Sequence, residues 1–297
     1  MRVFVTGATG WVGSAVVQEM IGAGHTVVGL CRSREKAADL AAAGAEVLMG
    51  AIEDVALLKE AAGRCDGVIH TAFNHDFSRM AESGAVEQGA IAALGEAVAG
   101  SDRPVLVTSG VALLTPGEMA TEETAPRAEN AAFPRNPEAA VQALRERGVK
   151  ACAIRLAPSV HGHGDHGFVP RLIDFARAGG VSPYIGEGLN RWPAVHRLDA
   201  ARLYRLALER AYDGPALHAI AEEGVPFREI AAVIGRRLGV PVVSQSPQEA
   251  AAHFSWFAMF AAIDCPASSR LTRDRLGWTP REPGLLADLD HPAYFGG

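Results

Sequence analysis

The chain has 297 residues, of which 48% are hydrophobic and 21% charged, and its net charge is −6. The composition is typical of a globular protein, and the length predicts two domains or one large domain with an added lobe. No run of basic residues is present, so nucleic-acid binding is not expected. The most apolar late stretch, residues 253–263, is shorter than the about 20 residues that cross a bilayer, so no membrane partner is expected.

The cysteines indicate a reducing compartment. Cys31, Cys65, Cys152 and Cys265 are widely spaced and form no CxxC pair, so neither a zinc site nor a disulfide framework is expected. The chain opens on the strand-like segment RVFVTG rather than on a secretion signal. A cytoplasmic location is therefore expected.

The first half of the chain alternates strand-like and helix-like segments. The strands are continuous apolar runs, which is typical of a parallel sheet covered by helices on both faces. Strand–helix alternation with short connections predicts a doubly wound α/β sheet, the Rossmann arrangement. The predicted strands cover residues 2–7, 25–32, 45–50, 66–73, 103–110 and 149–158, and the predicted helices cover 10–24, 34–43, 54–63, 84–99 and 137–147.

The second half of the chain is less regular. Residues 159–170 are rich in glycine and histidine and are predicted to form a loop. This half predicts a smaller C-terminal lobe that binds substrate. Helices are predicted over 169–178, 198–210, 226–238 and 246–252. The expected division is a dinucleotide-binding domain of residues 1–160 and about 195–220, and a substrate lobe of about 161–194 and 221–297.

The segment TGATGWVG, residues 6–13, follows the first strand and opens the first helix. Gly7 permits a tight turn, Gly10 lets the backbone approach a pyrophosphate, and Gly13 lets the helix pack closely on the strand. The free amides at the start of the helix favour phosphate groups. This context predicts a dinucleotide site; the alternative is a glycine-rich turn without a ligand.

The end of the second strand predicts which dinucleotide is bound. An acidic residue there would bind the ribose 2′-hydroxyl of NAD, but the chain has Cys31 at that position, followed by Arg32 and Ser33. A guanidinium beside a hydroxyl suits a 2′-phosphate. NADP is therefore favoured, with NAD still open. The alternative for Arg32 is a solvated charge at the start of a helix.

Taken together, these motifs resemble the short-chain dehydrogenase/reductase superfamily on its extended side, the NAD(P)-dependent epimerase/dehydratase-like proteins. The resemblance covers nearly the whole chain. Its motifs are TGATGWVG, DGVIHTAF, VLVTSG, AIRLAPSVHGHGD, RWPAVHRLDAARLYRLALE with Asp199 at the usual aspartate, and RLGWTP at 275–280.

The resemblance implies a set of cofactor contacts. Gly7, Thr9, Gly10, Trp11, Val12 and Gly13 would bind the phosphates, Arg32 and Ser33 the 2′-phosphate, and Ile52 the adenine, while Thr71, Ala72 and Phe73 would line the cleft and Pro158 and Val160 would lie near the nicotinamide. Ala51 stands where the family usually has an aspartate, which removes one expected adenine contact.

The chain departs from the family at its catalytic YxxxK pair. Hydride transfer to a carbonyl leaves an alkoxide that must be protonated, and the family's tyrosine supplies that proton. Here no tyrosine occurs between residues 110 and 155. Counting back from Glu138 puts the tyrosine position near Asn130 or Ala131 and the lysine position near Pro134 or Arg135. Arg135 could hold a ribose hydroxyl, but it is too basic to transfer a proton.

Three residues are candidates for the chemistry. Ser109 is the preferred match for the family's catalytic serine, although the same strand can be aligned with Gly110 there; the alternative is a serine that ends a strand. His161 stands where the family has a tyrosine, and imidazole titrates near neutral pH, but it could simply pack in the cleft wall. Tyr184 lies in a segment that the family uses near substrate, or is a lobe-core aromatic.

Several other features have less specific interpretations. His75 and Asp76 follow the fourth strand at the cleft mouth. They could supply a replacement acid or belong to a solvated loop. Glu122 and Glu123 are expected in a solvated loop. The spacing of His161, His163, Asp165 and His166 matches no common zinc pattern, so no metal is expected. The aromatic run that includes His253, Phe254, Trp256, Phe257, Met259 and Phe260 could line an apolar pocket or form lobe core.

The sequence therefore predicts an NADP-dependent oxidoreductase that transfers hydride to or from a small carbonyl or alcohol. Ser109 would polarise the substrate oxygen, and a non-tyrosine acid or water would supply the proton. A non-catalytic NAD(P)-binding sensor is the main alternative. An epimerase is disfavoured by the missing Tyr/Lys pair and by the lack of a basic site for a second nucleotide. The expected partner is a small-molecule substrate, and a homodimer is left open.

Overall fold

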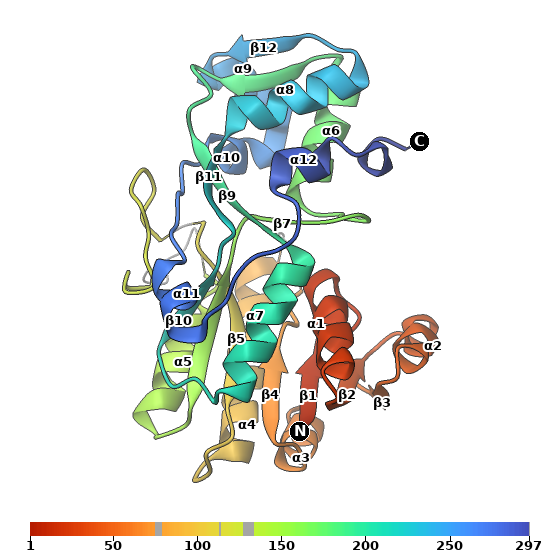
Figure 1. Ribbon diagram of the computed structural model, residues 1–297, viewed down its shortest axis with the longest axis vertical. Helices are drawn as coiled ribbons and strands as arrows, with labels where there is room; N and C mark the ends of the chain where they lie inside the picture. The colour runs from red at the N-terminus through yellow and green to blue at the C-terminus, as the bar shows by residue number, and fades with distance from the viewer. Residues whose placement is uncertain (75–78, 113, 127–133, 297) are drawn as a thin grey trace.

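The computed structural model describes residues 1–74, 79–112, 114–126 and 134–296. Its larger half is a seven-stranded parallel sheet with helices on both faces (Figure 1), which confirms the predicted doubly wound fold. The strand order is β10-β6-β5-β4-β1-β2-β3. The strands are β1 (Arg2–Thr6), β2 (Thr26–Cys31), β3 (Glu46–Met49), β4 (Gly67–His70), β5 (Val105–Gly110), β6 (Ala151–Leu156) and β10 (Ala216–Ala219).

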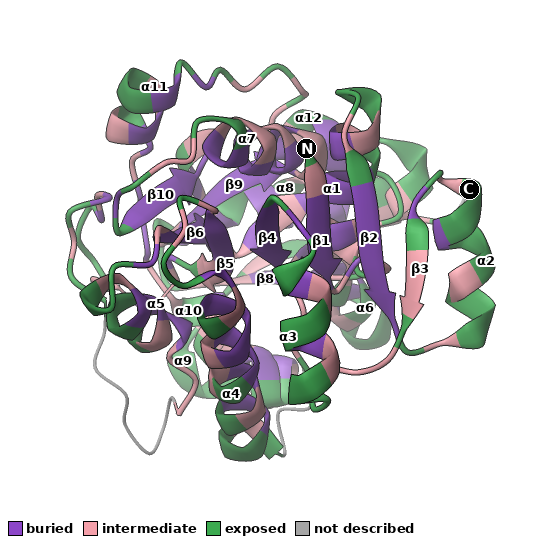
Figure 2. Cartoon of the chain, turned by 90° about the horizontal axis from the view of Figure 1, so that it is seen from below, coloured by how far each residue is buried: buried purple, intermediate pink, exposed green. Residues whose placement is uncertain are grey.

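Each face of this sheet is covered by its own set of helices. One set is α1 (Trp11–Gly22), α2 (Arg34–Ala42) and α7 (Arg197–Glu209), and the other is α3 (Val55–Gly63), α4 (Met80–Val98) and α5 (Pro137–Glu146). On β1, Val3 and Val5 join the first of the two cores, whereas Phe4 joins the second. Both faces of the central strands are buried (Figure 2), which explains why the successive residues Val3, Phe4 and Val5 are all apolar.

Most of the remaining elements form a lobe above the carboxyl ends of the strands (Figure 1). Its own core is rich in aromatic side chains: Trp192 packs edge-on against Phe227 at 5.1 Å, and Phe168 against Phe257 at 5.0 Å. The lobe contains the three-stranded sheet β11-β9-β7 (Glu222–Pro226, Arg191–His196, Ser159–His161), the two-stranded sheet β12-β8 (Val242–Gln245, Ser182–Ile185), and the helices α6 (Phe168–Gly179), α8 (Phe227–Leu238), α9 (Pro247–Phe254), α10 (Ala258–Ala262) and α12 (Leu285–Leu289).

Several sequence predictions need correction. Residues 159–170 were expected to form a loop, but Ser159–His161 is a strand because it pairs with β9. The strand β10, which pairs with β6, was not predicted at all. The predicted helix over 84–99 begins earlier, at Met80. For the aromatic run, the lobe-core alternative holds at Phe254 and Phe257, which are buried, whereas Trp256 and Met259 are exposed.

The chain returns from the lobe to the large sheet near its end. Helix α11 (Arg270–Leu276) lies against β10, and Trp278 is buried with its indole N–H donating to the carbonyl oxygen of Asp199, at 3.0 Å. Short 3₁₀ turns occur at Ser255–Phe257 and Pro292–Tyr294. Within the described parts of the chain, no helix combines the length and the apolarity that crossing a bilayer requires.

Candidate functional site

The glycine-rich turn lies where the strand order reverses, because β1 is flanked by β4 on one side and by β2 on the other. In doubly wound sheets this switch point is where ligands bind. Gly7 has a φ of +67°, a left-handed conformation that favours glycine, and its carbonyl accepts a hydrogen bond from the amide of Gly10 at 2.9 Å. Gly10 then begins α1 without a side-chain cap. The first amides of α1 are therefore available to an anion.

The turn has no room for side chains at two of its glycines. A Cβ on Gly13 would lie 2.0 Å from the carbonyl oxygen of Gly7, and a Cβ on Gly7 would lie 2.7 Å from the amide nitrogen of Ala72. Thr71 donates its hydroxyl hydrogen to the carbonyl oxygen of Thr6 at 2.8 Å, which ties the end of β4 to the end of β1. This packing brings the predicted residues Thr71 and Ala72 directly against the turn.

Trp11, the first residue of α1, is held from three sides. Its indole N–H donates to the carbonyl oxygen of Val160 at 2.7 Å, which brings Val160 and the adjoining Pro158 segment to the turn. The His166 ring packs edge-on against it at 5.6 Å. The guanidinium of Arg197 lies 4.2 Å above its ring. The sequence analysis did not single out Arg197, although it stands inside the quoted segment RWPAVHRLDAARLYRLALE.

The end of β2 presents the predicted cofactor-selecting residues. Ser33 caps α2, its hydroxyl oxygen accepting from the amide of Lys36 at 3.4 Å. Cys31 is buried and donates to the carbonyl oxygen of Ser33 at 3.1 Å. Arg32 is exposed and makes no ion pair with any residue in the described ranges. Its charge is therefore free to meet a ligand. Ile52 packs half-buried against the core of the α3–α5 face.

A buried ion pair lies between the ends of β4 and β5. Arg135, at the position expected for the family's lysine, binds both carboxylate oxygens of Glu87, at 2.8 and 2.5 Å. It also donates to the carbonyl oxygen of Thr108 at 3.2 Å and lies 4.2 Å above the ring of Phe73. Burial raises the pKa of Glu87 in spite of this pair. Glu87 was not predicted from the sequence, because nothing local marks a helical glutamate as buried.

Ser109 takes part in a second buried network. Its hydroxyl donates to Glu138 at 2.7 Å, and Glu138 also binds Arg155, whose Nη2 lies 2.7 Å from its second oxygen. Arg155 is 2% exposed and also donates to the carbonyl oxygens of residues 121 and 124. Its Nη1 lies 3.3 Å from Nε2 of His218. Burial lowers the pKa of His218 to about 4. Ser109 is half-buried and Gly110 exposed, so the serine lies at the accessible end of this network.

The prediction for Glu122 is wrong, while its neighbour Glu123 is exposed as expected. Glu122 is only 3% exposed. One of its carboxylate oxygens accepts from both the amide and the hydroxyl of Thr272, each at 2.6 Å. A residue 150 positions away in the chain therefore buries it. No local sequence pattern reports such a contact.

His161 is fully buried under the C-terminal segment. Its Nδ1 lies 2.8 Å from Asp288, and Tyr294 donates its hydroxyl to the same carboxylate oxygen at 2.7 Å. Burial opposes the charge of Asp288, but these hydrogen bonds outweigh it and lower the pKa of that carboxyl. Nε2 of His161 is buried and unbonded among the described residues. Asp288 and Tyr294 were not predicted as partners of His161, because they come from the last elements of the chain.

The other residues of the histidine-rich segment do not form a metal site. His163 stacks on His291 at 4.1 Å, and burial raises the pKa of Asp165 to about 6. Asp165 accepts a hydrogen bond from the amide of Gly167 at 2.7 Å, where α6 begins. Across the described ranges, no three His, Cys, Asp or Glu side chains are arranged to hold a metal ion.

The remaining candidates lie elsewhere. Tyr184 is on β8, where it is paired with Ser244 of β12, and β12 lies at the far end of the lobe from β5 (Figure 1). His75, Asp76, Asn130 and Ala131 lie outside the described residues. The structure thus brings together the turn, Thr71, Ala72, Trp11 and Val160, whereas Tyr184 and Ser109 belong to different sheets.

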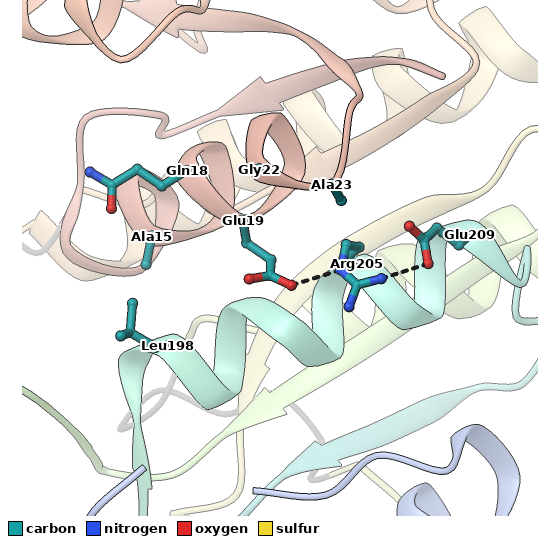
Figure 3. A pocket seen from close by; sticks show the side chains of 8 residues that line it. All are labelled: Ala15, Gln18, Glu19, Gly22, Ala23, Leu198, Arg205 and Glu209. Atoms are coloured by element: carbon teal, nitrogen blue, oxygen red, sulfur yellow. Dashed lines mark hydrogen bonds and ion pairs between the residues drawn. The ribbon is translucent and has the colours of Figure 1, made fainter. Parts of the chain in front are cut away.

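A separate groove of about 640 Å³ runs between α1 and α7 on the outer face of the sheet (Figure 3). Arg205 crosses it, donating to Glu19 at 2.7 Å and to Glu209 at 2.9 Å. Each charge that lines the groove therefore has a partner. Unlike the region of the glycine-rich turn, this groove therefore offers no unpaired charge to a ligand.

Known proteins of similar sequence cover nearly the same length as this chain. Proteins described as uncharacterized from two yeasts align with nearly the whole chain. The one from Schizosaccharomyces pombe is 48% identical over 297 residues, covering 99% of this chain and 100% of the relative. The one from Saccharomyces cerevisiae is 43% identical over 291 residues, covering 97% and 98%.

Among solved structures, the UDP-glucose 4-epimerase of Thermus thermophilus in complex with NAD has a TM-score of 0.75 at 19% identity, covering 100% of this chain and 99% of that chain. At this identity the likeness shows a shared fold. Residues 3–220 match the sequence profile of the NAD dependent epimerase/dehydratase family. The resemblance drawn from the motifs is thereby confirmed, and the chain belongs to the NAD dependent epimerase/dehydratase family.

Proposed function

We propose that this protein is an NADP-dependent oxidoreductase that transfers hydride to or from a small carbonyl or alcohol. The observation that carries the proposal is the glycine-rich turn at the β1/β4 switch point, with its uncapped helix start and its contacts too close for a Cβ. A bound nicotinamide supplies or accepts the hydride. The residues of this chain bind and orient that group and the substrate.

The preference for NADP rests on the residues after β2. Cys31 leaves no carboxylate to accept a hydrogen bond from a ribose 2′-hydroxyl, and Arg32 is exposed without an ion pair to the described residues. A guanidinium binds a 2′-phosphate with charge-assisted hydrogen bonds. The solved relative from Thermus thermophilus contains NAD, so the two dinucleotides must be compared directly.

Of the three catalytic candidates, Ser109 is the best placed. Its hydroxyl points its hydrogen at Glu138, but Glu138 keeps its hydrogen bonds to Arg155 if the serine turns away. Turning toward a substrate oxygen therefore costs about one hydrogen bond, roughly 1–2 kcal/mol. His161 is fully buried and Tyr184 lies in the far sheet of the lobe. In this proposal water supplies the proton, and Arg135 orients the nicotinamide ribose.

The test is a comparison of binding and turnover. Calorimetric titration should give a lower Kd for NADPH than for NADH, and Arg32→Gln should remove that preference. NADPH carrying deuterium at C4 should then transfer it to a member of a panel of small aldehydes and ketones, which mass spectrometry of the product detects. Tight NADPH binding with no deuterium transfer to any carbonyl would contradict the oxidoreductase proposal.

A cofactor-binding regulator is the second candidate. It is favoured by the end of β5, where the polar side chains of Ser109, Glu138 and Arg155 satisfy one another. A regulator predicts different affinities for NADP⁺ and NADPH without turnover. The same titration and deuterium experiment separates the two candidates. An epimerase is less favoured, because the sequence has no tyrosine between residues 110 and 155, where the family's tyrosine and lysine pair belongs.

A further inference from the structure

Arg197 is a cation without a counter-charge. It is half-buried, and burial lowers its pKa. Its guanidinium makes no hydrogen bond or ion pair with the described residues, and its one contact of note is the ring of Trp11, 4.2 Å away. Every other arginine in the described ranges that is at least half-buried has a carboxylate or carbonyl partner, as Arg205 has Glu19 and Arg135 has Glu87.

The place of this cation is fixed from both sides. Trp11, which lies under it, is the residue directly after Gly10 and is locked by its hydrogen bond to the carbonyl oxygen of Val160. Arg197 is the first residue of α7, and the side-chain carbons of Arg197 lie close to Gly162, where a Cβ would be 3.3 Å away. The guanidinium is therefore held beside the amino end of α1. Burying a charge without a partner is unfavourable, so a site that does so favours binding of the opposite charge.

We infer that Arg197, supported on the ring of Trp11, binds the diphosphate of the dinucleotide and so supplements the amides of α1. This inference rests on the proposed cofactor binding. The amides provide only partial charges, whereas a guanidinium adds a full charge and can form two parallel hydrogen bonds with phosphate. Arg197 is thus a positioning residue for the cofactor, distinct from Arg32, which would meet the 2′-phosphate.

The experiment compares two ligands by calorimetry. NADP⁺ contains the diphosphate, and adenosine 2′-phosphate has the same adenosine and 2′-phosphate without it. Arg197→Gln should weaken NADP⁺ about 10- to 100-fold, the loss of charge-assisted hydrogen bonds, and leave adenosine 2′-phosphate nearly unchanged. Arg205→Gln, on the same helix, should change neither affinity. Arg32→Gln should weaken both ligands. The melting temperature of Arg197→Gln should not fall, because the variant removes an uncompensated charge.

The outcomes separate this inference from the proposed function. If wild-type protein binds no dinucleotide, the proposed function is overturned and this inference with it. If wild-type protein binds NADP⁺ and Arg197→Gln binds it within about threefold, only the role of Arg197 is overturned. An equal loss for both ligands, or a lower melting temperature, would assign Arg197 to the fold rather than to the diphosphate.

Discussion

The ends of β1 and β5 lie at the same edge of the large sheet, yet their polar groups are arranged in opposite ways. After β1, the amides of α1 and the guanidinium of Arg197 have no partner among the described residues. After β5, Ser109, Glu138 and Arg155 bond to one another. Groups left free mark a place for a ligand, whereas groups that satisfy each other stabilise the fold. We therefore expect the first region to bind the cofactor and the second to be mainly structural.

The largest expected effect is at Arg155, which tests whether the β5 network is structural. Arg155→Met leaves the buried carboxylate of Glu138 without its cation, so the free energy of unfolding should fall by roughly 3–5 kcal/mol. Urea unfolding followed by circular dichroism measures it. Arg64→Met removes an exposed pair with Glu60 and should change stability by less than about 0.5 kcal/mol. If both variants lose equally little free energy of unfolding, the β5 network does not stabilise the fold.

A substitution at Gly13 tests whether the turn after β1 binds the dinucleotide. A Cβ there would lie 2.0 Å from the carbonyl oxygen of Gly7, so Gly13→Ala must push the turn out of shape. We expect NADPH affinity to fall roughly 100-fold, as overpacking of a few kcal/mol implies. Gly22→Ala is the matched control in the same helix, because nothing lies within 4 Å of its Cβ position. Unchanged affinity in Gly13→Ala would show that the turn does not bind the dinucleotide.

A substitution at Ser109 tests whether one residue can have both roles, because Ser109 belongs to the β5 network and is also half exposed. Ser109→Ala should lower the free energy of unfolding by about 1–2 kcal/mol, through the lost hydrogen bond to Glu138. Turnover should fall about 10- to 100-fold with KM little changed, if the serine polarises the substrate oxygen. A stability loss without a loss of kcat would assign Ser109 to the structural side and favour the regulator.

The smallest effect concerns pH and Asp165, beside the cofactor turn. Its pKa is raised to about 6 by burial, against an ordinary value of 3.8. The folded state therefore holds this proton more tightly, so the contribution of Asp165 to stability is greatest below pH 4 and is lost as the pH rises through 6. At pH 7.5, Asp165→Asn should be more stable than wild type by about 1 kcal/mol, which is part of the roughly 3 kcal/mol that the full change in pKa corresponds to, because the side chain stays partly exposed to water.

At pH 3.5 to 4 the advantage of Asp165→Asn should vanish. Thermal unfolding across this pH range measures the difference. Asp174→Asn, an exposed position on α6, is the control and should track wild type at every pH. A parallel pH curve for Asp165→Asn and wild type would show that Asp165 titrates normally.

Much of the large sheet could be predicted because its signals are local. The run of apolar residues in β1, the glycines at 7, 10 and 13, and the first apolar turn of α1 follow one another directly in the sequence. Burial of both faces gives continuous apolar strands, and the sequence displays this pattern without any knowledge of distant contacts. The cofactor turn could be located for the same reason.

The features that the sequence did not predict depend on distant residues. β10 is only four residues, Ala216–Ala219, and is a strand because β6 pairs with it. His161 would not be expected in a strand from its glycine-rich surroundings, but β9 supplies the hydrogen bonds. The burial of Glu122 depends on Thr272. Short segments take their structure from tertiary partners, and no local pattern reveals those partners.

The late arrival of β10 has a consequence for synthesis of the protein. Until Ala216–Ala219 has left the ribosome, β6 is an edge strand with its hydrogen-bonding groups unpaired, and the chain must first make β7, β8, β9 and α7. Exposed strand edges of this kind pair with other chains. Nascent chains ending between β6 and β10 should therefore need a chaperone, and a fragment that ends after β6 should aggregate even though it contains the whole glycine-rich turn.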